Sequence, residues 1–145
     1  MQAVMHFIVG ILLFHAIENP VIAFIVIFLS HYVVDILVKV TYHPKDPQPQ
    51  SKFWVGYHIF LLILTIIATI LFIRVYFWVM IVSMIPDIVD WFFVRPVLKK
   101  TPIFHPLIER IRESKLFAWI PDLTMNPKAS IVEMIMLIAL YGFYF

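Results

Sequence analysis

The chain has 145 residues, of which 63% are hydrophobic and 14% are charged, and its formal net charge is +2. Soluble domains are roughly 45–50% apolar, so this composition predicts an all-α integral membrane protein, with membrane lipids as partners and no nucleic acid. Cysteine is absent, which excludes disulfides, thiolate metal ligands and cysteine nucleophiles. Any metal ion must therefore be bound by His, Asp or Glu.

Apolar segments divide the chain into five predicted transmembrane helices that form one membrane domain, 1–145. Their ranges are 2–17, 21–42, 53–73, 75–94 and 129–145. Asn19 is expected to cap the second helix, with Pro20 at its first helical position. The polar loop 43–52 carries three prolines and cannot be helical throughout. Arg74 separates the third segment from the fourth, and Pro86 is expected to kink the fourth.

The connector 95–128 contains an amphipathic stretch. Phe104, Leu107, Ile108 and Ile111 recur at helical spacing among charged residues. This pattern predicts an interfacial helix anchored by Trp119. The alternative is a solvent-facing helix that packs on the bundle.

Basic residues indicate the orientation in the membrane. With five spans, the N-terminus, the loop 43–52 and the connector share one side, and ten of the eleven Lys and Arg residues lie there. The positive-inside rule makes this side cytoplasmic. We therefore expect a multi-pass protein of a prokaryotic cytoplasmic (inner) membrane, with its N-terminus in the cytoplasm and its C-terminus outside.

Ionisable residues lie deep inside these apolar segments, where each costs at least ~2.5–3.5 kcal/mol at mid-bilayer. His31 and Asp35 are i, i+4, and Asp87 and Asp90 are i, i+3, so each pair lies on one helix face. A rise of about 1.5 Å per residue brings six residues into one layer of the cytoplasmic half. They are His6, His31, Asp35, His58, Asp87 and Asp90.

A metal ion is one way to stabilise carboxylates in this layer, and protonation of some of them is another. Imidazoles with carboxylates suit zinc, and also manganese or iron. A structural hydrogen-bonded pair between His31 and Asp35 is the simplest alternative. His43, His105 and Glu133 lie on the same side and are possible additional ligands.

Three short motifs resemble a known family. His6 to Gly10 gives H-x3-G, Ser30 to Asp35 gives SH-x3-D, and Pro86 to Asp90 gives PD-x2-D. They resemble motifs of the LexA-regulated, YdjM-like family of predicted membrane-bound metal-dependent hydrolases. The resemblance implies metal binding by His6, His31, Asp35, Asp87 and Asp90. Here the motif order is reversed, and the nearest counterpart of the family's HRGxTHS stretch is FHP at 104–106.

These features together predict a membrane-embedded hydrolase with a His/Asp metal site open to the cytoplasmic face. Its substrate would be a phospholipid or a lipid-linked ester, and Asp90 would act as the general base. The alternative is a transporter or channel for divalent cations or protons, because intramembrane Asp and His residues also form such pathways. That alternative requires a polar connection from His31 to His15 and Glu18. A third possibility is a structural or partner-binding protein.

Overall fold

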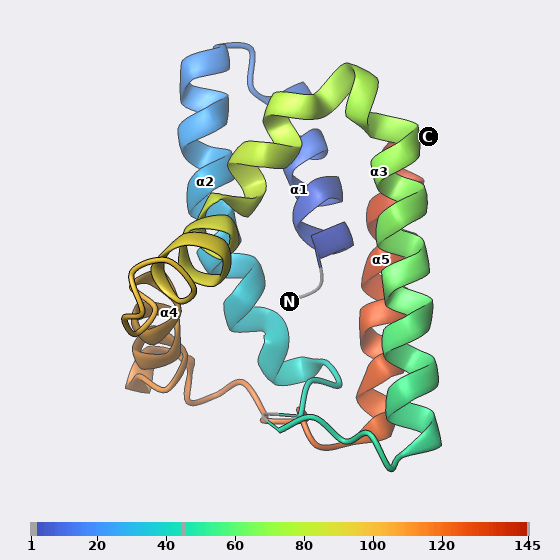
Figure 1. Cartoon of the computed structure of the whole chain (residues 1–145). Coiled ribbons are helices and arrows are strands. Elements are labelled where there is room, and N and C mark those ends of the chain that lie inside the picture. The colour runs from blue at the N-terminus through green and yellow to red at the C-terminus, as the bar shows by residue number, and fades with distance from the viewer. Residues whose placement is uncertain (1–2, 45, 145) are drawn as a thin grey trace.

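The structure is a computed structural model that describes residues 3–44 and 46–144. Within these ranges the chain is helical and contains no β-strand, which confirms the all-α prediction. The helices are α1 (Ala3–Ala16), α2 (Pro20–Ile36), α3 (Lys52–Asp87), α4 (Phe104–Arg112) and α5 (Ser130–Tyr144), as Figure 1 shows. Short 3-10 turns lie at Leu37–Val40, Lys115–Phe117 and Pro127–Ala129, and a π-helical segment spans Ile88–Val94.

Helix α1 lies in the middle of the fold and packs against α2, α3 and α5 (Figure 1). Gly10 permits the close approach. A Cβ atom at this position would meet side-chain atoms of Ser83 and Val79 at 3.3 Å and of Ile27 at 3.4 Å. The absence of a side chain thus brings α1 close to α2 and to the second half of α3.

The start of α2 follows the predicted capping pattern. Asn19 Oδ1 accepts hydrogen bonds from the backbone N–H groups of Val21 and Ile22, at 3.0 and 3.2 Å. Pro20 occupies the first helical turn, where a missing N–H costs nothing. The α-helix ends at Ile36, and a 3-10 turn continues it to Val40.

The third and fourth predicted segments are both helical, and they meet at a kink inside α3. The chain stays helical through Arg74, and the break comes at Tyr76, whose φ and ψ of −114° and 25° are not helical. Tyr76 is buried, and its hydroxyl lies 2.6 Å from Nε2 of His15, which ties the bend to the end of α1. Beyond Pro86, where we expected a kink, α3 leads into the π-helical segment.

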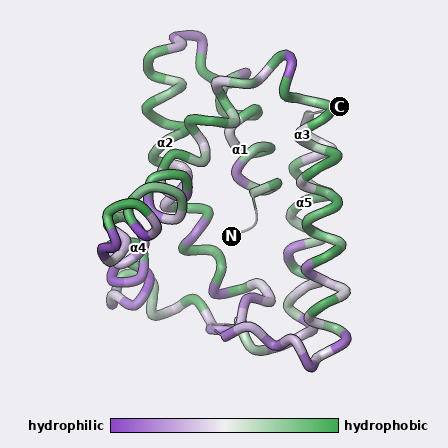
Figure 2. Tube along the Cα trace, viewed as in Figure 1, coloured by the Kyte–Doolittle hydropathy of each residue, from purple (hydrophilic) through white to green (hydrophobic). Residues whose placement is uncertain are grey.

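Two helical stretches are long and apolar enough to cross a membrane, namely Pro20–Val40 and Lys52–Val94. Helices α1 and α5 have 14 and 15 residues, fewer than the roughly 20 that a span requires. The five predicted spans therefore stay a prediction. Hydrophobic residues run along most of α2, α3 and α5 (Figure 2). Large apolar side chains such as Ile70 and Ile138 are exposed, as on a lipid-facing surface.

The connector helix α4 contains all four residues of the amphipathic pattern, and it packs against α2 and α3. Ile108 is buried on its inner face, whereas Trp119 beyond it is 78% exposed. The packing agrees with the bundle-bound alternative, and the exposed Trp119 agrees with the predicted interfacial anchor.

Candidate metal site

His6 of α1 and His31 of α2 stack face to face in the interior. Their ring centroids are 4.1 Å apart and their planes differ by 16°. Both side chains are 1% exposed or less. Asp35, one turn beyond His31, lies against both rings, because its two oxygens are each 3.3 Å from an Nε2 atom, Oδ1 from His6 and Oδ2 from His31.

The tautomer of His31 follows from its surroundings. Its Nδ1 atom lies 2.8 Å from the backbone carbonyl oxygen of Ser83. A carbonyl only accepts hydrogen bonds, so Nδ1 carries a proton, and Nε2 presents a lone pair when the ring is neutral. That lone pair faces Asp35 Oδ2 at 3.3 Å and Asp87 Oδ1 at 3.7 Å. Lone pairs and carboxylates converge in this way around a bound cation, with the other ring nitrogen held by a backbone carbonyl.

His6 supports the same interpretation. Neither of its ring nitrogens has a hydrogen-bond partner among the described residues, and the same is true of Nε2 of His31. A buried polar atom without a partner costs about 1–3 kcal/mol. A cation between these nitrogens and the nearby carboxylates would satisfy them.

Asp90 holds the start of α4 and orients His105. Its side chain is fully buried, and it accepts hydrogen bonds from the N–H groups of Ile103, Phe104 and His105 at 2.7, 2.8 and 2.9 Å. It also accepts one from Nδ1 of His105 at 2.8 Å. Nε2 of His105 then lies 3.0 Å from Asp87 Oδ1. A carboxylate behind a histidine fixes the ring for a metal ion on the other side.

The charge of His105 depends on these two acids. Burial lowers the pKa of its imidazole, but the hydrogen bonds to Asp87 and Asp90 outweigh burial and raise the pKa above its usual value. Nε2 of His105 also lies 3.2 Å from Nε1 of Trp91, whose indole N–H only donates hydrogen bonds.

Two groups of three side chains bring one ligand atom each to within 4.8 Å of one another. One group is His6, His31 and Asp87, and the other is Asp35, Asp87 and His105. These residues lie in or beside α1, α2, α3 and α4, so the fold assembles them from distant parts of the chain. The donor set of imidazoles and carboxylates, together with the unpartnered nitrogens, fits a divalent metal ion.

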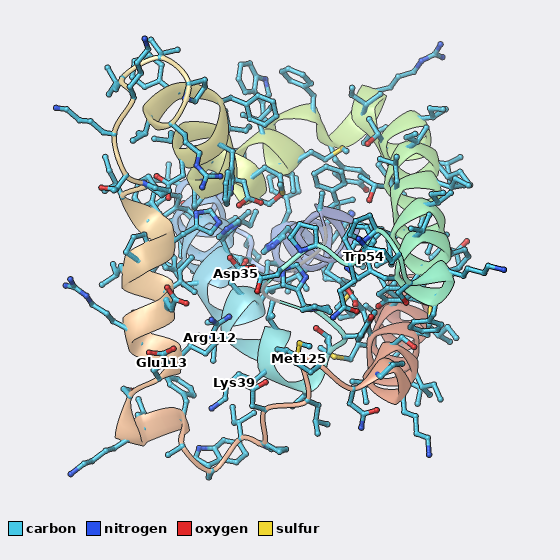
Figure 3. All side chains as sticks on the ribbon, turned by 60° about the horizontal axis from the view of Figure 1, so that its bottom comes forward. Asp35, Lys39, Trp54, Arg112, Glu113 and Met125 are labelled. Atoms are coloured by element: carbon cyan, nitrogen blue, oxygen red, sulfur yellow. The ribbon has the colours of Figure 1, made fainter. Side chains whose placement is uncertain are left out.

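A cavity of about 580 Å³ lies beside the second group. Asp35, Asp87 and His105 line its inner wall, and His43, Trp91 and Arg112 line other parts. Figure 3 shows Arg112 projecting from α4 toward the side of the molecule where Asp35 lies. The candidate metal site is therefore reachable from this cavity.

The other predicted site residues lie elsewhere. The ring of His58 lies against Trp54 at a tilt of 31°, and its Nδ1 lies 2.8 Å from the Trp54 carbonyl oxygen. Glu133 is buried on α5 and accepts a hydrogen bond from the Tyr57 hydroxyl. Neither belongs to the two ligand groups. His43 lies on the cavity wall, and burial lowers the pKa of its imidazole to about 4.

An apolar layer covers the far side of the site. One turn beyond His6, His31 and Ser83, the three helices place Ile27 and Val79 around Gly10, where a Cβ atom would lie 3.4 and 3.3 Å from their side chains. Ile27 and Val79 are buried. Farther from the site, Nε2 of His15 lies 2.6 Å from the Tyr76 hydroxyl. His15 is one of the two residues that a transport pathway would have to reach.

No protein-family model, curated protein or solved structure matches this chain. The resemblance to the YdjM-like family therefore stays a prediction. From the sequence we predicted His105 only as an additional ligand. Its position in the FHP element, which follows the PD-x2-D motif in the chain, could have indicated a place in the site. No sequence signal pointed to the Ser83 carbonyl, which orients His31 through the backbone.

Proposed function

We propose that this chain is a membrane-embedded, metal-dependent hydrolase. His6, His31, Asp35, Asp87 and His105 would bind a divalent metal ion on the inner wall of the cavity, with zinc as the first choice and manganese or iron as alternatives. The observation that carries the proposal is the position of the buried Nε2 of His31, which faces the carboxylates of Asp35 and Asp87 while Nδ1 donates to the Ser83 carbonyl.

The chemistry requires an activated water and a group that accepts its proton. A bound divalent metal ion lowers the pKa of water toward neutrality. The water oxygen attacks the phosphorus or carbonyl carbon of the ester, the ester bond breaks, and the alcohol leaves with a proton. Asp87 is the better-placed proton acceptor, because its side chain is 20% exposed whereas that of Asp35 is 7% exposed.

Asp90, which the sequence suggested as the general base, receives a different role. Both of its oxygens accept hydrogen bonds from the start of α4, and one of them also accepts from His105. We therefore assign Asp90 as the positioning residue for His105, since a carboxylate with these partners is poorly placed to abstract a proton from water.

The cavity supports an amphiphilic substrate. Phe92, which is 75% exposed, and Trp91 offer apolar surface. Arg112 and His43 offer polar contacts on other parts of the wall. An acyl chain would lie along the aromatic side chains, while an anionic head group would contact Arg112, whose guanidinium suits phosphate and carboxylate groups.

A transport pathway, the alternative from the sequence, receives less support. It would have to connect His31 with His15, but the layer of Gly10, Ile27 and Val79 lies between them. The buried side chains of Ile27 and Val79 in this layer are apolar and offer no polar group to a pathway. A site that opens on one side suits a hydrolase. We retain five spans in a cytoplasmic (inner) membrane as part of the proposal.

Metal content and lipid hydrolysis of the purified protein test the proposal together. The wild-type chain should retain a divalent metal through purification, as measured by inductively coupled plasma mass spectrometry, and should hydrolyse short-chain phospholipids or lipid-linked esters. Asp87→Asn should lose the metal and reduce turnover by about a thousandfold or more. His15→Ala is the matched control and should retain both. Unchanged metal content in Asp87→Asn would contradict the proposal.

A further inference from the structure

The two ligand groups share one residue. Asp87 belongs both to the group with His6 and His31 and to the group with Asp35 and His105. Its Oδ1 atom lies 3.7 Å from Nε2 of His31 on one side and 3.0 Å from Nε2 of His105 on the other. A carboxylate between two sets of ligands is the usual bridge of a site that holds two ions about 3.5–4 Å apart.

We propose that the cluster binds two divalent metal ions, with Asp87 as their bridge. This inference rests on the proposed function and specifies its metal site further. The inner ion would be bound by His6 and His31, and the outer ion by Asp35 and His105. Asp35 also lies 3.3 Å from both inner imidazoles, so its carboxylate can contribute to either ion.

The number of donors supports two ions. Five side chains converge on the cluster, whereas a tetrahedral zinc site of the catalytic type uses three protein ligands and a water. Each of the two groups supplies three protein ligands by itself.

Charge supports the same conclusion. Asp35, Asp87 and Asp90 are three carboxylates in or behind one cluster, and Asp35 and Asp90 are buried. A single divalent ion leaves a net negative charge among these acids when the histidines are neutral. A second divalent ion makes the cluster positive. A positive cluster on a cavity wall would attract an anionic group such as a phosphate ester.

The two positions differ in how the fold builds them. The inner position uses side chains from α1, α2 and the end of α3, which pack tightly around Gly10. The outer position needs His105 from α4, and Asp90 orients that ring. Removing His105 should therefore remove the outer ion and leave the inner one in place.

Metal stoichiometry and electron paramagnetic resonance test the inference without reference to activity. The full-length chain is purified in detergent, freed of metal with a chelator, loaded with Mn²⁺ and desalted. We expect two manganese ions per chain and the broadened spectrum of a spin-coupled pair. His105→Ala should retain one ion and give the sharp sextet of an isolated Mn²⁺. His58→Ala, which alters a histidine outside the cluster, should behave as the wild type does.

The outcomes separate this inference from the proposed function. One ion per wild-type chain with an uncoupled sextet would overturn the two-metal inference and leave the hydrolase proposal intact. No bound manganese and no bound zinc would overturn both. Circular dichroism and gel filtration test whether the His105→Ala variant is folded. If the variant is unfolded, the spectrum of Mn²⁺ in the wild type alone decides between one ion and two.

Discussion

Two groups of buried polar side chains lie within these apolar helices, and they differ in how their hydrogen bonds are arranged. In the metal cluster, nitrogen atoms of His6 and His31 lack hydrogen-bond partners among the described residues and lie close to carboxylates. The Glu133 group consists of Tyr57, His58 and Glu133. There the tyrosine donates to the acid, and the histidine lies at hydrogen-bond distance from the carbonyl of Trp54.

The comparison shows why residue type and depth alone do not define a metal site. Both groups combine acids and histidines at buried or partly buried positions in predicted spans. A ligating histidine needs one nitrogen held by an acceptor and the other free to face the ion. Nδ1 of His31 is held by the Ser83 carbonyl and Nδ1 of His105 by Asp90, and Nε2 of each ring faces a carboxylate of the cluster. His58 belongs to neither of the two ligand groups.

The largest expected effect separates the two groups directly. His31→Ala should remove at least the inner metal ion, because it removes the best-oriented ligand of that position. His58→Ala should leave metal content unchanged, since this ring belongs to the Glu133 group. Mass-spectrometric metal analysis of both variants, purified side by side, measures the difference. Loss of metal from His58→Ala alone would reverse the assignment of the two groups.

A smaller effect should follow from Asp90→Asn. The amide retains the shape of the side chain but weakens the hold on His105 and on the start of α4. Loss of such an outer partner typically weakens metal affinity by about 10–100-fold. Competition with a fluorescent chelator measures the dissociation constant. Asp122→Asn is the matched control in the same connector, because Asp122 bonds only locally to Thr124, and its metal affinity should stay at the wild-type value.

Helix periodicity and local spacing predicted much of this arrangement. The all-α fold and the Asn19 cap follow from local chemistry, and the structure confirms both. The i, i+4 spacing of His31 and Asp35 placed them together, and depth along the helices brought His6 and Asp87 near them. These features follow from the spacing of residues along individual helices.

The remaining features depend on contacts between distant segments. His58 was expected at the depth of the cluster, but depth does not determine which way a side chain faces, and its face of α3 lies toward Trp54 and Glu133. Arg74 was taken as a boundary between two spans, whereas the bend lies at Tyr76, which His15 of another helix contacts. The local sequence pattern does not determine which way His58 faces or that His15 contacts Tyr76.

The Glu133 group should affect stability and leave the metal unaffected. Tyr57→Phe removes the donor to Glu133, whose other oxygen already lacks a partner among the described residues. A buried acid without a donor costs about 1–3 kcal/mol, so the free energy of unfolding should fall by that amount in thermal or denaturant unfolding. Replacing both partners, with Tyr57→Phe and Glu133→Leu, should recover much of the loss. Altered metal content in Tyr57→Phe would link the two groups.

The smallest expected effect is a pH dependence that His43 contributes from the cavity wall. Burial lowers the pKa of its imidazole from 6.5 to about 4. Between these values the unfolded chain binds the proton and the folded chain does not, so stability is present above pH 6.5 and is lost as the pH falls toward 4. One proton changes the free energy of unfolding by at most about 1.4 kcal/mol per pH unit.

The variant His43→Gln isolates this contribution from that of the other titrating groups. Unfolding of the wild type and of the variant is compared at pH 7 and at pH 5, and the wild type should lose more stability than the variant between the two values. Because His43 lies outside both ligand groups, the metal content of the variant at pH 7 should equal that of the wild type. Equal losses of stability in the wild type and the variant would show that His43 is accessible to protons in the folded chain. A lower metal content in the His43→Gln variant would place His43 among the metal ligands.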